Sequence, residues 1–450
     1  MRKREVNMLE GSIIKGLLSI SVPIMIMNVL QSLFNIIDMT VLKSYDTSGV
    51  GVGAVGVCGT LITLITGLVI GISAGANVVI ARFIGEGNRE KAERAVGTSM
   101  AIALTGGAIL MVLGVSFAEV FLGWNNCPLE LLPKAAVYFR LYFVGAPLLL
   151  IYNFCAAVLR AAGDSGRPMI FVIVGGVVKV LCNFLFVGVF EMSVEGVALA
   201  TIVSWIVIAG LGVLALLRNK GMIHLNYKTI RFYKHETRSV LRIGVPAGLQ
   251  QGLYSLANVV ISAAVNSFGP DATTGISIAN NFDSILYQIS TAPALAVMPY
   301  VSQNIGAGNI KRASKSVGRG ILITVTLGAT FGALSAIFSG QLSSIMSDSP
   351  AVIAYSQQKM VIISSTYFIC GINEIMGSSL RGMGRPNIAT ISTLIFMCAL
   401  RFLWVYVIFP LYPNLTFLYL VWPIGWVLSI VMLLCYFFPT LKKQERLHTV

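Results

Sequence analysis

The sequence is poor in charged residues, which occupy only 11% of its 450 positions. A soluble globular protein has about 25%, so the composition excludes a soluble fold. Acids are scarcer than bases, with 18 Asp and Glu against 32 Lys and Arg, and the net charge is +14. Hydrophobic residues reach 56% and the mean hydropathy is +0.83. These values indicate a chain that crosses a membrane several times.

Several kinds of chemical site are missing as well. The seven cysteines form no CxxC pair, so neither a zinc site nor a redox pair is expected. No GxxxxGK[ST] loop occurs, which argues against ATP hydrolysis. The three histidines (His224, His235 and His448) lie outside the apolar runs, so a proton relay in the membrane would have to use carboxylates. We expect neither an enzyme nor a cofactor.

Apolar runs long enough to cross a bilayer, about 20 residues each, occur twelve times. The predicted fold is an all-α polytopic membrane protein with twelve transmembrane helices. Residues 1–217 would form an N-terminal lobe with helices 1 to 6, and residues 243–450 a C-terminal lobe with helices 7 to 12 and a short tail. Residues 218–242, the longest polar stretch, would link the lobes.

The basic residues are distributed unevenly along this topology. The N-terminal segment, the tail and alternate loops hold 26 of the 32 Lys and Arg. By the positive-inside rule, both termini and the linker are predicted to be cytoplasmic in a multi-pass protein of the plasma membrane. The same distribution argues against a nucleic-acid partner, and we expect membrane lipids as the surroundings.

The chain contains the same pattern twice. Three segments recur in one order, at offsets of 223, 221 and 221 residues: SVPIMIMNVLQSLFNIID from Ser21 and GVPAGLQQGLYSLANVVI from Gly244; ARFIGEGNREKAERAVG from Ala81 and SQNIGAGNIKRASKSVG from Ser302; LRAAGDSGRP from Leu159 and LRGMGRP from Leu380. Because each half holds six spans, the two halves have the same orientation. Two pseudo-symmetric lobes around a central cavity are typical of secondary transporters.

These motifs resemble the multidrug and toxic compound extrusion (MATE) family. The resemblance rests on Pro23 followed by Asp38, on IGEGNREKA and RAAGDSGRP, and on their copies IGAGNIKRA and RGMGRP. It covers essentially the whole chain. It implies two six-helix lobes and export of organic, often cationic compounds in exchange for entering Na⁺ or H⁺.

The first predicted helix carries Asp38 in its outer half. Ionisable groups inside spans are costly and indicate function by default. Gln31, Phe34 and Asn35 precede it at helical spacing and could form a polar and aromatic stripe lining a cavity. A carboxylate can hold H⁺, Na⁺ or an organic cation, but not all at once, and that competition is the basis of exchange. The resemblance also assigns ion coupling to an acid here; the alternative is a structural partner for Lys179.

The fifth predicted helix departs from the family pattern. Relatives of this kind have an asparagine and an aspartate four residues apart, whereas the matching positions here hold Lys179 and Asn183. An unpaired ammonium in the membrane costs about 3 kcal/mol or more, so we expect Lys179 to occupy Asp38 when neither substrate nor coupling ion is bound. Thr201 fits a polar position of the family, or it bonds back to its own helix.

The second half holds three further ionisable residues in its spans. Asp283 and Arg401 have similar predicted depths and could pair, whereas Glu374 has no evident partner. Further candidate cavity-lining residues are Asn153, Tyr254 and Tyr287. Tyr287, one turn after Asp283, could stack on a flat cation.

The function predicted from all these features is a Na⁺- or H⁺-coupled antiporter that exports amphipathic, cationic organic compounds and works as a monomer. Two alternatives remain open. One is a flippase or exporter of a lipid-linked or polysaccharide precursor. The other is a channel or a membrane scaffold that transports nothing.

Overall fold

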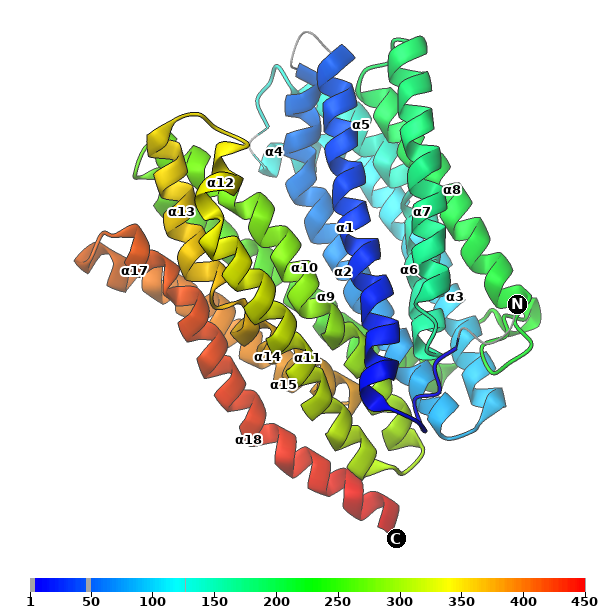
Figure 1. The fold of residues 1–450 in the computed structure, drawn as a ribbon. Coiled ribbons are helices and arrows are strands. Elements are labelled where there is room, and N and C mark those ends of the chain that lie inside the picture. The colour runs from blue at the N-terminus through cyan, green and yellow to red at the C-terminus, as the bar shows by residue number, and fades with distance from the viewer. Residues whose placement is uncertain (1–4, 46–49, 126, 450) are drawn as a thin grey trace. The chain divides into compact units, whose positions relative to one another are not determined.

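The structure, a computed structural model, describes residues 5–45, 50–125 and 127–449. Every regular element in these ranges is helical (Figure 1). The predicted all-α fold is therefore confirmed. Contacts group the chain into two compact units: unit 1 comprises Met1–Val6 and Ile26–Gly248, and unit 2 comprises Asn7–Met25 and Leu249–Val450.

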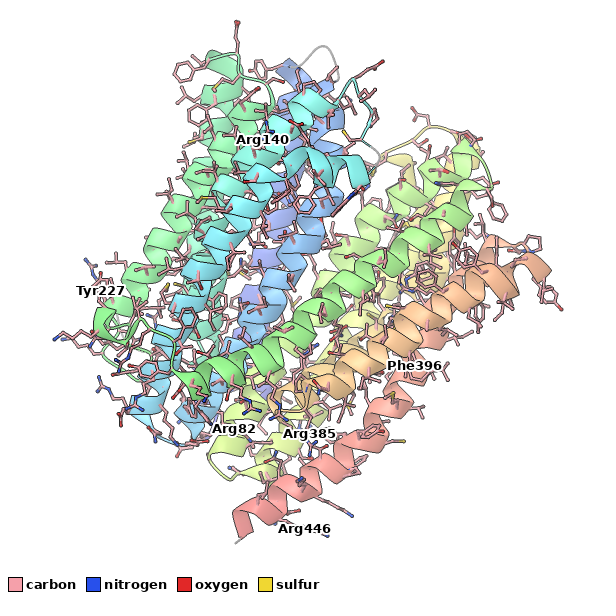
Figure 2. All side chains as sticks on the ribbon, turned by 180° about the vertical axis from the view of Figure 1, so that it is seen from behind. Arg82, Arg140, Tyr227, Arg385, Phe396 and Arg446 are labelled. Carbon is pink, nitrogen blue, oxygen red and sulfur yellow. The ribbon has the colours of Figure 1, made fainter. Side chains whose placement is uncertain are left out.

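Unit 1 contains the helices of the first repeat. Helix α1 (Ile13–Tyr45) begins in unit 2 and enters unit 1 at Ile26. The other elements are α2 (Val50–Gly85), α3 (Arg89–Ser116), α4 (Ala118–Trp124), α5 (Leu132–Val144), α6 (Ala146–Ala161), α7 (Gly166–Asn183), a π-helical turn (Phe184–Val189), α8 (Val194–Leu217) and a short 3₁₀ turn (Tyr227–Thr229). Arg82 and Tyr227 lie at one end of this unit and Arg140 at the other (Figure 2). The loop after α2 and the linker therefore share one end.

Unit 2 repeats this order. Helix α9 (Lys234–Asn266) passes from unit 1 to unit 2 at Leu249. The following elements are α10 (Pro270–Gly306), α11 (Ile310–Ile337), α12 (Ser339–Ser344), α13 (Pro350–Ser364), α14 (Tyr367–Gly382), α15 (Pro386–Thr393), a π-helical turn (Leu394–Ala399), α16 (Leu400–Leu403), a second π-helical turn (Trp404–Ile408), a 3₁₀ turn (Phe409–Leu411), α17 (Leu415–Tyr419) and α18 (Val421–Thr449).

Helical segments occupy all twelve predicted spans. Within the described ranges, eight helices are long and apolar enough to cross a membrane by themselves. Two pairs, α5 with α6 and α13 with α14, are each bent by 46° and would each make one further span. The remaining two positions belong to α9 and α10, which are less apolar because α9 begins with charged residues and α10 carries Asn, Asp and Pro side chains.

The duplicated loops GEGN and GAGN have the same local structure in both units. Gly87 and Gly308 adopt φ values of 68° and 72°, which only glycine reaches without strain. The next residue caps the following helix: the Asn88 side chain accepts from the Lys91 amide, and the Asn309 side chain from the Arg312 amide. Such caps stabilise a helix start by about 1 kcal/mol. The repeated sequence therefore encodes a repeated loop structure.

Candidate functional site

Unit 1 contains a cavity of about 440 Å³ between its helices. Helix α1 contributes residues from Gln31 to Met39, and α2, α5, α6, α7 and α8 complete the wall. The lining includes six of the predicted residues: Gln31, Phe34, Asn35, Asp38, Lys179 and Thr201. The polar stripe predicted on the first helix therefore does face a cavity.

Asp38 and Lys179 form an ion pair at the wall of this cavity. The Nδ2 atom of Asn183 donates to the Asp38 carboxylate at 2.6 Å, so α7 supplies two donors to one acid on α1. Asp38 is 8% exposed. Sequence separation and depth alone left the two charges about 10 Å apart before helix tilt, and the helix packing in unit 1 closes that gap.

A glycine sets the approach of α7 to α1. A Cβ atom on Gly176 would lie 1.9 Å from the ring of Phe34. Lys179 follows Gly176 by almost one helical turn and Asp38 follows Phe34 by slightly more than one, so close packing at the first two residues brings the charged pair together. On the other side of α7, the Ser204 hydroxyl of α8 donates to the carbonyl of Gly175 at 2.8 Å.

One oxygen beside Asp38 has no partner among the described residues. The Oδ1 atom of Asn183 is buried and accepts no hydrogen bond. Together with the Asp38 carboxylate, it provides oxygen ligands of the kind that hard cations prefer. No cluster of three or more His, Cys, Asp or Glu occurs in the described ranges, so a transition-metal site is not indicated there. The oxygen pair suits a weakly bound, exchangeable monovalent cation.

Two other predicted residues of unit 1 turn toward their own helices. The Thr201 hydroxyl lines the cavity but donates to the Val197 carbonyl at 2.9 Å, which is the structural alternative considered for it. The Asn153 amide donates to the Leu149 carbonyl at 2.8 Å, and Leu149 rather than Asn153 lines the cavity. The structure therefore does not place Asn153 on this cavity, because its side chain bonds to its own helix.

Aromatic residues of the cavity were not identified from the sequence. Tyr138 and Tyr142 on α5 and Trp205 on α8 line it. The rings of Tyr142 and Trp205 meet edge to face, 4.8 Å between centroids. The tyrosines lie four residues apart and therefore share a helix face, which is the one sequence signal that could have indicated them.

Unit 2 contains a second buried ion pair, but between residues other than those predicted. Asp283 pairs with Lys359 at 3.0 Å, and Lys359 also contacts the Asn280 side chain. The predicted pairing of Asp283 with Arg401 is wrong. Lys359 lies on α13, which buries it to 4% exposure and so makes it the available partner.

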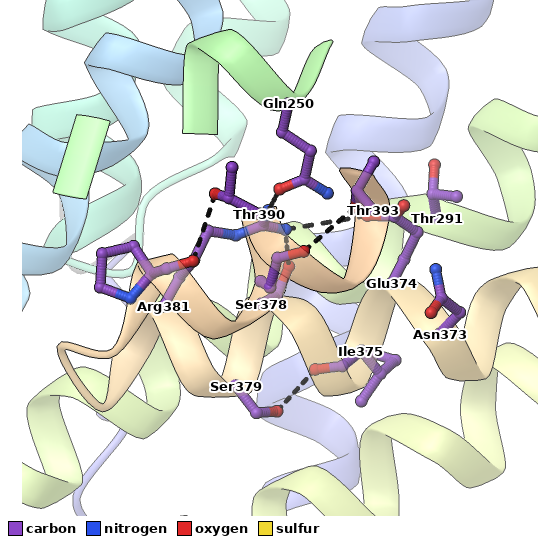
Figure 3. Close-up of polar contacts among 12 residues, drawn as sticks. Gln250, Thr291, Asn373, Glu374, Ile375, Ser378, Ser379, Arg381, Thr390 and Thr393 are labelled. Atoms are coloured by element: carbon purple, nitrogen blue, oxygen red, sulfur yellow. Dashed lines mark hydrogen bonds and ion pairs between the residues drawn. The ribbon is translucent and has the colours of Figure 1, made fainter. Parts of the chain in front are cut away.

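Glu374 also has a partner, contrary to the expectation. Arg381 lies 3.7 Å from Glu374 and hydrogen-bonds to Gln250 at 2.8 Å and Ser378 at 2.9 Å (Figure 3). The two charges are seven residues apart, which places them on the same face of α14 two turns apart. Arg381, in the last turn of α14, is only 9% exposed.

Arg401 is 1% exposed and contacts α9 and α18 instead of an acid. Its guanidinium lies over the rings of Tyr254 at 4.8 Å and Trp422 at 5.1 Å and donates to Asn258 at 2.6 Å. Tyr254 therefore stacks on a cation of the protein itself. Tyr287 is partly buried and packs against the apolar cluster of unit 2.

Known proteins resemble the chain along most of its length. The family model MatE matches residues 23–185 and 246–407, which are the two repeats. The "Probable multidrug resistance protein YpnP" of Bacillus subtilis is 26% identical over 395 residues, 87% of this chain and 88% of the relative. An "FAD transporter" of Shewanella oneidensis is 25% identical over 390 residues, 84% of each.

The fold is also found in solved structures. A transporter of the MOP superfamily from Pyrococcus furiosus, 20% identical, has a TM-score of 0.89 and covers 98% of this chain and 99% of its own. The duplicated family match confirms the two repeats deduced from the motifs. The protein is therefore a membrane transporter rather than an enzyme, and it belongs to the MATE family.

Proposed function

We propose that the protein is a cation-coupled antiporter that exports amphipathic, cationic organic compounds through the cavity of unit 1. The observation that carries the proposal is the ion pair of Asp38 and Lys179 at the wall of that cavity. The carboxylate is neutralised by a cation of the protein, so another cation can take the place of Lys179 at the carboxylate while the cavity leaves the displaced ammonium accessible to water. The name of the Bacillus subtilis relative, a multidrug resistance protein, supports this choice of substrate.

The aromatic wall suits the proposed substrates. Phe34, Tyr138, Tyr142 and Trp205 surround the cavity that contains Asp38. Flat organic cations are attracted to the faces of such rings by about 0.5–2 kcal/mol each. A carboxylate among aromatic rings therefore binds a cation by charge and an apolar body by contact, a combination that tolerates many chemical structures.

The exchange cycle follows from the chemistry of the pair. In the empty carrier Lys179 holds the Asp38 carboxylate. An arriving Na⁺ or H⁺, or an organic cation, displaces the ammonium, and Asn183 contributes its Oδ1 atom to a metal cation. Because one carboxylate cannot hold both cations, loading one releases the other. Lys179 lowers the affinity for each cation, but it keeps the empty carboxylate from carrying ions across alone.

The relatives also define the limits of this proposal. The Shewanella oneidensis relative is named for FAD, an anionic cargo. The Pyrococcus furiosus transporter is described as having a binding pocket of reverse polarity, which suggests a different function for that protein. The charge of the cavity wall therefore determines which substrates this chain can select. In unit 1 that wall includes an acid, Asp38.

The decisive experiment is transport by purified protein in liposomes, with Na⁺ and pH gradients imposed separately. Asp38→Asn should reduce gradient-driven export of a cationic dye to background, because the amide keeps the volume but cannot neutralise a cation. The exposed acid at the start of α10 provides the matched control, Asp271→Asn, which should transport normally. Normal export by Asp38→Asn would transfer the coupling role to another acid.

We further propose that the protein resides in the plasma membrane as a monomer with both termini in the cytoplasm. The basic loops support this orientation, and Arg82 and Tyr227 share one end of unit 1 (Figure 2). A cysteine introduced at Lys228 should react with an impermeant thiol reagent only after the cells are permeabilised. Labelling of intact cells would reverse the orientation.

A further inference from the structure

The pseudo-symmetric counterpart of the Asp38 site lies in unit 2 and has a different charge. In the register where Ser21 corresponds to Gly244, Asn35 corresponds to Asn258 and Asp38 to Ile261. The helix after the second GRP turn carries Arg401, which bonds to Asn258. The counterpart site therefore holds a cation and an amide, and it has an aliphatic residue in the place of the acid.

The guanidinium of Arg401 is not neutralised by the protein. Within the described ranges it makes no ion pair, and its Nη2 atom is buried without a hydrogen-bond partner. Leaving a charged donor unpaired in a buried site costs at least 1–3 kcal/mol. The two rings of Tyr254 and Trp422 return part of that cost through cation–π attraction, and the Tyr254 hydroxyl also interacts with the guanidinium, but Nη2 is still left without a partner.

The surroundings leave one side from which a ligand can approach. Asn258, which accepts from Nη1, is exposed, and the Tyr254 and Trp422 rings are each only partly buried. A planar anion that enters beside Asn258 and moves the Trp422 ring would receive both terminal N–H groups of the guanidinium. Such bidentate binding is the geometry in which arginine prefers carboxylates and phosphates.

We propose that Arg401 is the centre of an oxyanion-binding site in unit 2, which takes a carboxylate or phosphate group. The site is independent of the exchange proposed at Asp38, because different residues in a different unit form it. The oxyanion is either a free ion or the acidic group of a transported solute. In the absence of the anion, the aromatic rings of Tyr254 and Trp422 hold the guanidinium.

The test is anion-dependent stabilisation of the purified full-length protein in detergent. Phosphate and acetate should raise the thermal unfolding temperature relative to chloride at equal ionic strength, since a ligand bound only to the folded state stabilises it. In Arg401→Gln the apparent Kd for phosphate should rise roughly 10- to 100-fold, the equivalent of a hydrogen bond to a charged group. Arg385→Gln, the same change at an exposed arginine, should leave the Kd unchanged. Equal stabilisation by chloride, or an unchanged Kd in Arg401→Gln, would overturn the proposal.

A second measurement does not depend on folding of the Arg401 variant. Because Trp422 lies on the guanidinium, phosphate should change the tryptophan fluorescence of the wild-type protein, and Trp422→Phe should remove that change. No change in the wild type rules the site out. The source of the oxyanion is then separated with two dyes, rhodamine 110, which has a free carboxylate, and its methyl ester rhodamine 123. If Arg401→Gln selectively loses rhodamine 110 binding, the oxyanion is a solute carboxylate. If the variant still binds both dyes equally, the oxyanion is a free ion.

Discussion

The two buried ion pairs, Asp38–Lys179 in unit 1 and Asp283–Lys359 in unit 2, differ in their surroundings rather than in their charges. The acids are almost equally buried, at 8% and 7% exposure. Asp38 and Lys179 line the 440 Å³ cavity, whereas Asp283 lies on α10 among the helix residues that build the apolar cluster of unit 2, such as Ile276 and Leu286. A buried charge in a membrane helix is therefore not enough to identify a transport site. The two pairs differ in that, among the described residues, only Asp38–Lys179 lines this cavity.

The largest effect should come from breaking the pair of Asp283 and Lys359. Asp283→Asn leaves the Lys359 ammonium buried without its carboxylate, and removing one partner of such a pair costs about 3–5 kcal/mol. We expect a large drop in the free energy of unfolding, measured by thermal or denaturant unfolding in detergent. Asp38→Asn should cost clearly less, because the cavity gives Lys179 access to solvent.

The double variant Asp283→Asn/Lys359→Met controls this prediction. It removes both charges and should regain most of the stability, since uncharged replacements of a buried pair are often neutral. If Asp38→Asn proves as destabilising as Asp283→Asn, the contrast between the pairs is lost.

The next largest effect should come from giving unit 2 the acid that unit 1 has. Ile261→Asp places a carboxylate at the counterpart of Asp38, on the same helix as Asn258 and within one turn of it. The new acid should compete for Arg401 and raise the apparent Kd for phosphate by roughly tenfold, or about 1.4 kcal/mol. Ile261→Asn is the matched uncharged variant and should change the Kd much less.

The coupling between Asp38 and Lys179 should be somewhat smaller. Lys179→Ala frees the carboxylate and should increase the affinity for a cationic dye several-fold, because the dye no longer displaces an ammonium. The gain should vanish in an Asp38→Asn background. A double-mutant cycle on dye binding should give a coupling of about 1 kcal/mol, and strictly additive effects would show that the two residues act independently.

The smallest effect concerns the packing that brings this pair together. Gly176→Ala places a methyl group against the end of the Phe34 ring, which can turn into the cavity, so the loss of stability should be about 1 kcal/mol. Dye affinity should fall with it. Gly56→Ala is the control, because Gly56 also lines the cavity and nothing lies within 4 Å of an added Cβ.

The sequence was sufficient for the fold and for half of the site. Repeated motifs and apolar runs predicted the twelve segments, and the cost of a lone ammonium predicted that Lys179 would meet Asp38. The partners Lys359 and Arg381 could not be recognised as buried from the sequence, because charge was the only guide to the ends of helices. The 46° bend between α13 and α14 and the burial of α14's last turn keep both residues inside the protein.

The environment of Arg401 could not be predicted for a related reason. Two π-helical turns flank it, Leu394–Ala399 and Trp404–Ile408. Each π turn rotates the residues after it relative to an ideal α-helix, so depth estimated from the rise per residue matched Arg401 to Asp283 but gave no direction for the side chain. The sequence carries no visible signal for these turns.

The identical caps at Asn88 and Asn309 have a consequence for how such a carrier can diversify. A carrier assembled from two copies of one short chain must repeat every charge, so an acid in one copy is an acid in both. Once the copies are joined in a single chain, the caps can stay the same while one substitution changes the charge at only one of the two equivalent positions, Asp38 and Ile261. Joining the copies thus lets one ancestral binding surface become two that select opposite charges, and the cargo can change without any change in the scaffold.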